Sequence, residues 1–274
     1  MSERLEIDSG TSELLVEICD RVAIVTLNRP EVLNALSDRL IAALRKLIKR
    51  VGDDPEVGSI LITGAGAAFC AGGDVKSMNR RSAKIETTFE QRLTDLRVEQ
   101  RMVTGALVAV RKPTVAAISG PAAGAGLALA LACDLRIAAR SAILTTAYAR
   151  IGLSGDYGVT WLLTRLAGFS RARELMFLSE RIDAQRAEVL GLVNRVVPDG
   201  HLREMAFELA ASLAEGPPIA FGLMKDNLDH AVTSTFLESL DYEAERYTRT
   251  EQTRDHREGM RAFVEKRKPV FKGR

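Results

Sequence analysis

The chain has 274 residues, 46% of them hydrophobic and 27% charged, a balance that predicts a globular protein with a sizeable core. The 38 Lys and Arg residues against 36 Asp and Glu leave a formal charge of +2, which argues against nucleic acid as a partner. The 3 cysteines and 3 histidines lack metal-ligand spacing, so the sequence predicts neither a metal site nor a disulfide.

The N-terminal segment MSERLEIDSG is polar and does not resemble a signal peptide. The longest apolar run, 121–133, is interrupted by glycines and is too short to span a membrane. We therefore expect no membrane association and a cytoplasmic location.

Two strands and a helix are the first expected elements. The β-rich runs Leu14–Ile18 and Val22–Leu27 are separated by two residues, which indicates a hairpin. Ser37 is a plausible helix N-cap, apolar residues recur at helical spacing from 40 to 51, and Gly52 is placed to end the helix.

Three short apolar runs, 59–63, 114–119 and 134–139, are typical of buried strands in an α/β sheet. The charged segment 79–104 has a weak helical stripe, and from residue 158 onward the pattern is almost entirely helical. The predicted fold class is α/β, with a core over residues 1–200 and a helical C-terminal subdomain over 201–274.

Glycine-rich turns follow two of these strands. Gly64-Ala-Gly66 and Gly124-Ala-Gly126 both begin like a dinucleotide fingerprint, but Phe69 and Leu129 stand where its third glycine should be. Small residues let backbone N–H groups face a ligand, and a helix start favours an oxygen that becomes negative. The turns either form an oxyanion hole together or are tight strand-to-helix connections.

The same segments carry a resemblance to a known family. Residues 62–76 and 119–134 resemble the two oxyanion-hole loops of the crotonase (enoyl-CoA hydratase/isomerase) superfamily. Residues 27–36 resemble the family segment that lines the CoA channel, and residues 259–268 resemble its C-terminal signature. The resemblance implies a spiral of ββα turns, an acyl-CoA thioester substrate, no cofactor apart from the substrate's CoA, and a homotrimer or a hexamer made of two trimers.

Carried over position by position, the resemblance implies that the backbone amides of Ala71 and Ala125 hold the thioester oxygen. It places further substrate-binding residues in the same loops, in the channel segment and near the C-terminus: Val32, Gly72, Gly73, Asp74, Gly124, Phe263 and Lys266. Phe263 and Lys266 match positions that reach the CoA of a neighbouring subunit. Without the resemblance, they would be read as part of an exposed basic helix.

Hydratases of this family use two glutamates, and this chain has Ala128 and Tyr148 at the matching positions. An aspartate, Asp156, follows Tyr148 by eight residues, as in the single-aspartate acyl-CoA isomerases of the family, such as epoxyphenylacetyl-CoA isomerase. We expect Asp156 to be the acid/base, the alternative being that it caps the helix starting near Gly158. Tyr148 either orients the substrate or Asp156, or forms part of the pocket wall.

A single carboxylate in an apolar site, here expected from Leu153, Tyr157, Trp161 and Leu162, suits isomerisation better than hydration. The sequence therefore favours an enoyl-CoA isomerase acting through Asp156. Two alternatives stay open: a hydratase (lyase) that uses Asp156 and Tyr148 with a water, and a non-catalytic acyl-CoA binder.

Overall fold

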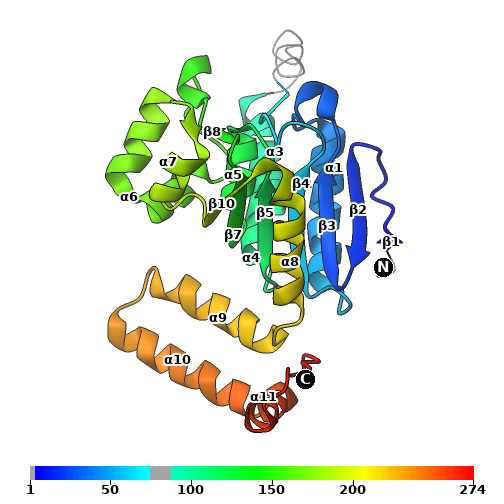
Figure 1. The fold of residues 1–274 in the computed structure, drawn as a ribbon. Helices are drawn as coiled ribbons and strands as arrows, with labels where there is room; N and C mark the ends of the chain where they lie inside the picture. Colours follow the sequence, from blue (N-terminus) through cyan, green and yellow to red (C-terminus); the bar gives the residue numbers. More distant parts are fainter. Residues whose placement is uncertain (1–3, 75–87) are drawn as a thin grey trace.

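The computed structural model describes residues 4–74 and 88–274, and it confirms the predicted α/β architecture with a helical C-terminal part (Figure 1). The strands are β1 (Leu5–Glu6), β2 (Leu14–Cys19), β3 (Val22–Leu27), β4 (Ser59–Gly64), β5 (Thr114–Ile118), β6 (Ala122–Ala123), β7 (Leu135–Ala139), β8 (Ile143–Thr145), β9 (Ile182–Asp183) and β10 (Arg195–Val197). The α-helices are α1 (Asp38–Asp53), α3 (Phe89–Gln100), α4 (Ala106–Ala109), α5 (Ala125–Leu131), α6 (Val159–Leu178), α7 (Ala184–Val189), α8 (Leu202–Ala214), α9 (Pro218–Ala231), α10 (Phe236–Glu251) and α11 (Arg254–Glu265). Shorter helical turns are η1 (Pro30–Val32), η2 (Arg101–Gly105), η3 (Tyr148–Ile151) and η4 (Asp199–His201).

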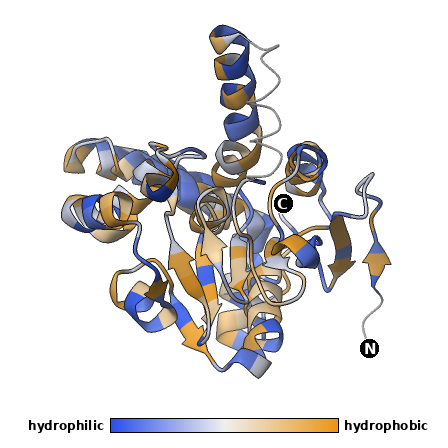
Figure 2. Cartoon of the chain, turned by 90° about the horizontal axis from the view of Figure 1, so that it is seen from above, coloured by the Kyte–Doolittle hydropathy of each residue, from blue (hydrophilic) through white to orange (hydrophobic). Residues whose placement is uncertain are grey.

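A mixed sheet forms the centre of the molecule, and its strand order over the described residues is β1-β2-β3-β4-β5-β7-β10. β1, β2 and β3 pair antiparallel, and from β3 to β10 the pairing is parallel. The β2–β3 hairpin is confirmed: Asp20 and Arg21 form its turn with φ values of 49° and 63°, as a two-residue hairpin turn requires. The strands are mainly apolar and the outer helices carry polar faces (Figure 2), which matches parallel strands buried on both sides.

Helices cover both faces of this sheet. α1 lies on one face, and its N-cap is Ser37, whose side chain accepts a hydrogen bond from the backbone N–H of Leu40. The predicted helix is thereby confirmed, except that it continues past Gly52 to Asp53. α8 packs on the other face through Leu202, Ala206 and other small apolar residues. The expected boundary between core and C-terminal subdomain at residue 200 would therefore assign α8 to a different subdomain from the sheet that it covers.

A smaller sheet, in the order β6-β8-β9 among the described residues, lies beside α5, α6 and α7. From residue 158 onward the sequence also predicted two successive helices, 161–166 and 170–178, and both lie within α6, separated by a kink at Gly168, whose backbone is not helical (φ 78°, ψ 164°). Within the segment predicted as helical from 79 to 104, residues 79–87 lie outside the described part. α3 covers most of the remainder, and the π-helical turn η2 joins it to α4.

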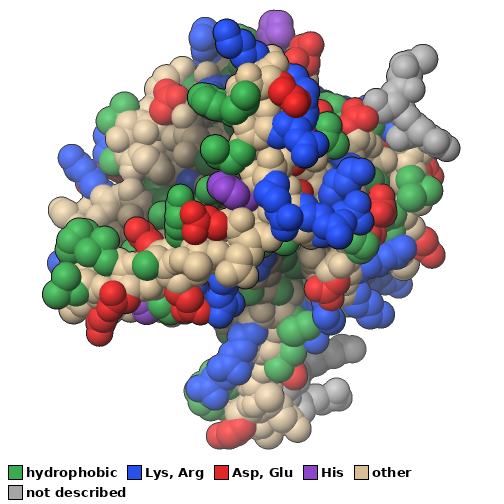
Figure 3. Space-filling model, turned by 90° about the horizontal axis from the view of Figure 1, so that it is seen from below, with side chains coloured by type: hydrophobic (Ala, Val, Ile, Leu, Met, Phe, Trp, Pro, Cys, Tyr) green, Lys and Arg blue, Asp and Glu red, His purple; other side chains and the backbone are tan. Residues whose placement is uncertain are grey.

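The three last helices form an arm, α9–α11, that extends below the sheet in Figure 1. Ion pairs attach it to the body: Arg111 contacts Asp226 (3.4 Å) and Asp229 (2.8 Å), and Lys225 contacts Asp134 (2.8 Å). Figure 3 shows hydrophobic and basic side chains exposed on the lower face. Large hydrophobic side chains of the arm that are exposed in this single chain are Met224, Leu228, Phe236, Leu237, Leu240, Tyr247, Met260, Phe263 and Val264.

Within the described ranges, 4–74 and 88–274, no helix combines the length and the apolar character needed to cross a membrane.

Candidate active site

The two glycine-rich turns lie side by side, because they follow the neighbouring parallel strands β4 and β5 at the same edge of the sheet. The N–H of Ala123 donates to the carbonyl of Cys70 at 2.9 Å, and the N–H of Cys70 donates to the carbonyl of Pro121 at 3.1 Å. A Cβ on Gly72 would lie 2.7 Å from the Ala123 oxygen and 3.5 Å from the Ala125 nitrogen. The close approach of the two loops therefore requires glycine at position 72.

The backbone amides of these turns differ in whether they are open to a ligand. The N–H of Ala71, predicted to hold the thioester oxygen, already donates to the carbonyl of Leu33 at 2.9 Å. The prediction for Ala71 therefore disagrees with the structure. Two residues further on, the N–H of Gly73 has no acceptor among residues 4–74 and 88–274.

Ala125 is the first residue of α5, where helical N–H groups have no partner within the helix. Its N–H likewise has no acceptor in the part of the chain that the structure describes. The preceding Gly124 has φ 52° and ψ −124°, a combination that only glycine adopts without strain. Gly73 and Ala125 therefore each supply an open amide, one in each turn.

Asn34 fixes the first turn from below. It is fully buried and has φ 58°, and its side-chain amide donates to the carbonyls of Ala65 (2.9 Å) and Ala68 (2.8 Å). Its side-chain oxygen accepts the N–H of Arg29 at 2.8 Å. Two bonds from one buried amide group thus join residues 28–36 to the first turn, and a third holds Arg29 and Asn34 together within that segment.

Arg29 adds an ionic anchor at the end of the same turn. Its guanidinium lies 3.3 Å from Asp74 and 3.5 Å from Glu13. Asp74 was predicted to contact substrate, and in this structure its pairing with Arg29 holds the end of the loop.

Val32, also predicted to contact substrate, lies in η1 and directly precedes Leu33, whose carbonyl accepts the Ala71 N–H. Val75 and Lys76, which end the family-like segment, lie outside the described residues.

Tyr148 and Asp156 are brought together beside the second turn. The Tyr148 hydroxyl donates to Oδ1 of Asp156 at 2.6 Å. Ring carbons of Tyr148 lie 3.8–3.9 Å from the position that a Cβ on Gly124 would occupy. The tyrosine ring therefore connects the carboxylate to the turn that presents the Ala125 amide.

The surroundings raise the pKa of the Asp156 carboxyl above its usual value. Burial is the main cause, and the Tyr148 hydrogen bond and the charge of Arg92 oppose it. Burial together with the Asp156 charge raises the pKa of Tyr148, so the phenol stays protonated and acts as the donor. The Asp156 carboxyl therefore holds a proton more readily than an exposed aspartate does.

The helix-capping alternative for Asp156 is wrong. α6 begins with Gly158 as its N-cap, and no side chain caps it. Of the side chains expected to desolvate Asp156, Tyr157 is buried as expected, whereas Leu153 is 43% exposed; Tyr148 is also buried. Trp161 and Leu162 line a different cavity, at the opposite end of α5 from the glycine turns.

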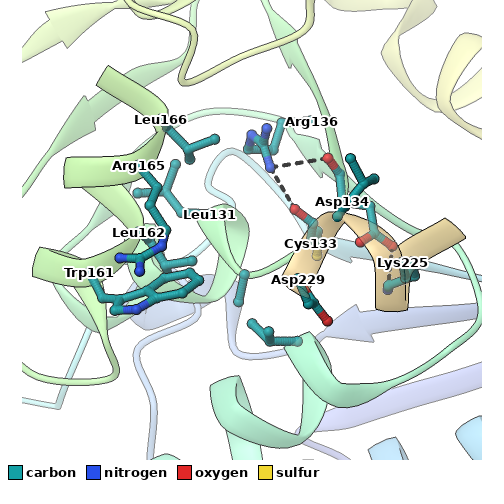
Figure 4. A pocket seen from close by; sticks show the side chains of 13 residues that line it. Leu131, Cys133, Asp134, Arg136, Trp161, Leu162, Arg165, Leu166, Lys225 and Asp229 are labelled. Atoms are coloured by element: carbon teal, nitrogen blue, oxygen red, sulfur yellow. Dashed lines mark hydrogen bonds and ion pairs between the residues drawn. The ribbon is translucent and has the colours of Figure 1, made fainter. Parts of the chain in front are cut away.

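Figure 4 shows that cavity, which lies between α6 and α9. The Arg165 guanidinium stacks over the Trp161 ring at 3.6 Å, and Arg136 is bonded to the carbonyls of Cys133 and Asp134. Because the cavity meets Leu131 and Cys133, at the far end of α5 from Ala125, it is separate from the open amides.

Ala128 occupies the interior of α5, one turn after Gly124, and it is fully buried. Its methyl group brings no acid or base to the site. Phe263 lies on α11 and Lys266 directly follows that helix, below the sheet, while the first turn is at the upper end of the sheet (Figure 1). Within a single chain, Phe263 and Lys266 therefore lie away from the two turns.

Two polar residues of α3 near Asp156 were missed by the sequence analysis. Arg92 contributes its charge to the carboxyl, and Gln100 accepts the backbone N–H of Tyr157 at 3.0 Å. Both contacts join residues more than fifty positions apart, and no local pattern signals them.

Comparison with known proteins places these features in a family context. A family model described as enoyl-CoA hydratase/isomerase matches residues 17–274. The chain is 38% identical over 255 residues to 1,2-epoxyphenylacetyl-CoA isomerase of Escherichia coli (strain K12), covering 92% of this chain and 95% of that protein. It is 36% identical over 251 residues to the mitochondrial enoyl-CoA hydratase of Pongo abelii, covering 92% and 83%.

The fold agrees with solved structures of similar proteins. The crystal structure of enoyl-CoA hydratase from Bacillus anthracis superposes with a TM-score of 0.89 and 34% identity, covering 96% of this chain and 100% of that one. The predicted crotonase-like fold is thereby confirmed.

Proposed function

The chain belongs to the enoyl-CoA hydratase/isomerase family, and from this premise we propose that it isomerises an enoyl-CoA through a thioester enolate. The observation that carries the proposal is the Asp156 carboxylate, bonded at 2.6 Å to Tyr148, whose ring packs against Gly124 directly before Ala125, together with alanine at position 128. One carboxylate beside two open amides suits a proton transfer within the substrate.

The reaction begins when ionised Asp156 removes a proton from C2 of a 3-enoyl-CoA. The electron pair of the broken C–H bond moves into the thioester carbonyl and gives a dienolate. Asp156, now a carboxylic acid, returns the same proton to C4, and the double bond ends between C2 and C3. Atoms and charge balance between the substrate and Asp156. The steps require no cofactor besides the substrate's own CoA.

The N–H groups of Gly73 and Ala125 hold the dienolate oxygen between the two steps. Neither N–H has another acceptor among the residues described, so both are available to donate to the thioester oxygen. An oxyanion-hole donor typically contributes about 3–4 kcal/mol to transition-state stabilisation. In this proposal Gly73 takes the part that the sequence analysis gave to Ala71, whose N–H is bonded to Leu33.

The CoA portion completes the proposal. We place it along residues 29–36 of its own chain, and we assign Phe263 and Lys266 to the CoA of a neighbouring subunit. Phe263 is 83% exposed on α11, and the arm carries other exposed apolar side chains, which supports contact with another copy of the chain. The assembly would be a trimer or a dimer of trimers.

Incubation with cis-3-enoyl-CoA, trans-2-enoyl-CoA and a saturated acyl-CoA tests the proposal, with products identified by mass and by NMR. We expect cis-3-enoyl-CoA to yield a 2-enoyl-CoA of unchanged mass. A product heavier by one water from the 2-enoyl substrate would favour hydration, as the Pongo abelii relative's name suggests. Binding of all three without any product would favour an acyl-CoA binder.

A further inference from the structure

The loop that carries Asp156 has an unusual backbone. Gly155, Tyr157 and Gly158 all have positive φ values, of 112°, 50° and 77°. Tyr157 is not a glycine and its side chain is buried, so this backbone is strained and persists only where contacts hold it in place. Such strain next to a reactive carboxylate marks a position whose geometry matters.

One contact that holds this backbone comes from α3. The side-chain oxygen of Gln100 accepts the Tyr157 N–H at 3.0 Å, on the peptide that directly follows Asp156. Gln100 is the last residue of α3, and the π-helical turn η2 begins at the next residue. Val103 and Thr104 of that turn are buried, whereas α3 has no buried residue, so the turn fixes the end of α3 that carries Gln100.

A base that collects a proton at one carbon and returns it at another needs a movable carboxyl on a fixed backbone. Tyr148 bonds to the carboxyl itself, and Gln100 bonds to the adjoining peptide. We propose that Gln100 is a positioning residue that fixes the main chain at Asp156 relative to the thioester amides. The inference rests on the proposed role of Asp156.

Three variants test this role. Gln100→Leu keeps the size of the side chain but removes the acceptor, and we expect kcat to fall about tenfold with KM changed less than about twofold. Gln100→Glu keeps an acceptor oxygen, and we expect kcat at high pH within about twofold of the unchanged protein. Asp95→Asn, on the exposed side of α3, is the matched control and should change nothing.

The pH profile tests whether residue 100 lies close enough to Asp156 to act on its carboxyl. Gln100→Glu adds a negative charge near Asp156, so the midpoint of turnover should move to higher pH. Tyr148 and Arg92 also face the carboxyl, and they are unchanged in every variant.

The decisive comparison repeats Gln100→Leu in an Asp156→Asn background. If Gln100 acts through Asp156, the second change should cause no further loss of turnover. Full turnover of Gln100→Leu alone, or an equal loss in both backgrounds, would overturn the inference. Full turnover of Asp156→Asn alone would overturn the proposed function and this inference with it.

Discussion

The hydroxyl of Tyr148 lies 2.6 Å from Oδ1 of Asp156, and the tyrosine ring packs against Gly124. Asp156 therefore has a fixed partner on the turn that presents the Ala125 amide. Its carboxyl belongs to the same local structure as the open amides, although it comes some thirty residues later in the sequence.

Replacing the carboxylate should abolish most turnover. We expect Asp156→Asn to lower isomerase kcat by at least about a hundredfold, because general acid/base groups contribute on that scale. Asparagine keeps the size and an oxygen that accepts the Tyr148 hydrogen bond, so acyl-CoA affinity should be preserved. Steady-state kinetics and calorimetric binding of a saturated acyl-CoA give the two readouts; unchanged kcat would remove Asp156 from the mechanism.

The same substitution should not destabilise the protein at neutral pH. The pKa of Asp156 is raised in the folded chain, so folding favours its protonated form and this contribution is lost as pH rises through the raised pKa. Asp156→Asn removes a buried charge, and the melting temperature at neutral pH should be unchanged or higher by about 1–4 °C. The difference in melting temperature between Asp156→Asn and the unchanged protein should shrink at acidic pH. A large loss of stability at neutral pH would contradict this electrostatic account.

Removing the phenol should shift the pH profile. The Tyr148 hydrogen bond lowers the pKa of Asp156, so Tyr148→Phe should raise that pKa and move the rise of turnover to higher pH. We expect kcat at the plateau to fall about three- to tenfold, because the ring remains and only the bond is lost. An unshifted profile measured from pH 4 to 9 would mean that the hydroxyl does not tune Asp156.

The amide of Ala125 can be removed by proline. Proline is tolerated at the first position of a helix, which Ala125 occupies in α5, so Ala125→Pro should fold. Loss of one oxyanion donor should lower kcat about 100- to 1000-fold. Ala125→Gly, which keeps the N–H, is the matched control and should remain active, and circular dichroism checks the fold. A folded Ala125→Pro protein with normal kcat would remove this amide from the oxyanion hole.

Assembly should depend on α11. We expect sedimentation to show a trimer or hexamer, and Phe263→Glu to lower both the assembled fraction and CoA affinity, because it places a charge on an exposed apolar side chain. Leu5→Glu, at an exposed apolar position outside the arm, is the control. A stable monomer that binds CoA normally would contradict the assignment of Phe263 to a neighbouring subunit.

The sequence predicted the elements that depend on local patterns. Ser37 and the apolar spacing that follows it gave α1, and the alternation on either side of Asp20 and Arg21 gave the hairpin. The nearness of the two glycine turns was also predictable, since each follows a buried strand. The role of Asp156 as a cap was excluded only by the structure, in which Gly158 is the N-cap residue of α6 and no side chain caps the helix.

Other features depend on contacts that no local pattern encodes. Whether Ala71 or Gly73 offers a free amide is decided by the register between the first turn and residues 33–36. The arrangement of Gln100 over Tyr157 needs both α3 and the irregular turn η2, and a weak helical stripe predicts neither. Trp161 was misplaced for the same reason, because its orientation on α6 is set by the packing of that helix.

The open amides of Gly73 and Ala125 have a consequence for how reactions diverge. Backbone groups survive most side-chain mutations, so a lineage that uses the proposed oxyanion hole can change residues such as 128, 148 and 156 and still keep the two amides. New chemistry then needs few substitutions and leaves overall similarity almost untouched. This explains how the chain can be 38% identical to an isomerase and 36% identical to a hydratase, and why descent alone is a poor guide to the product.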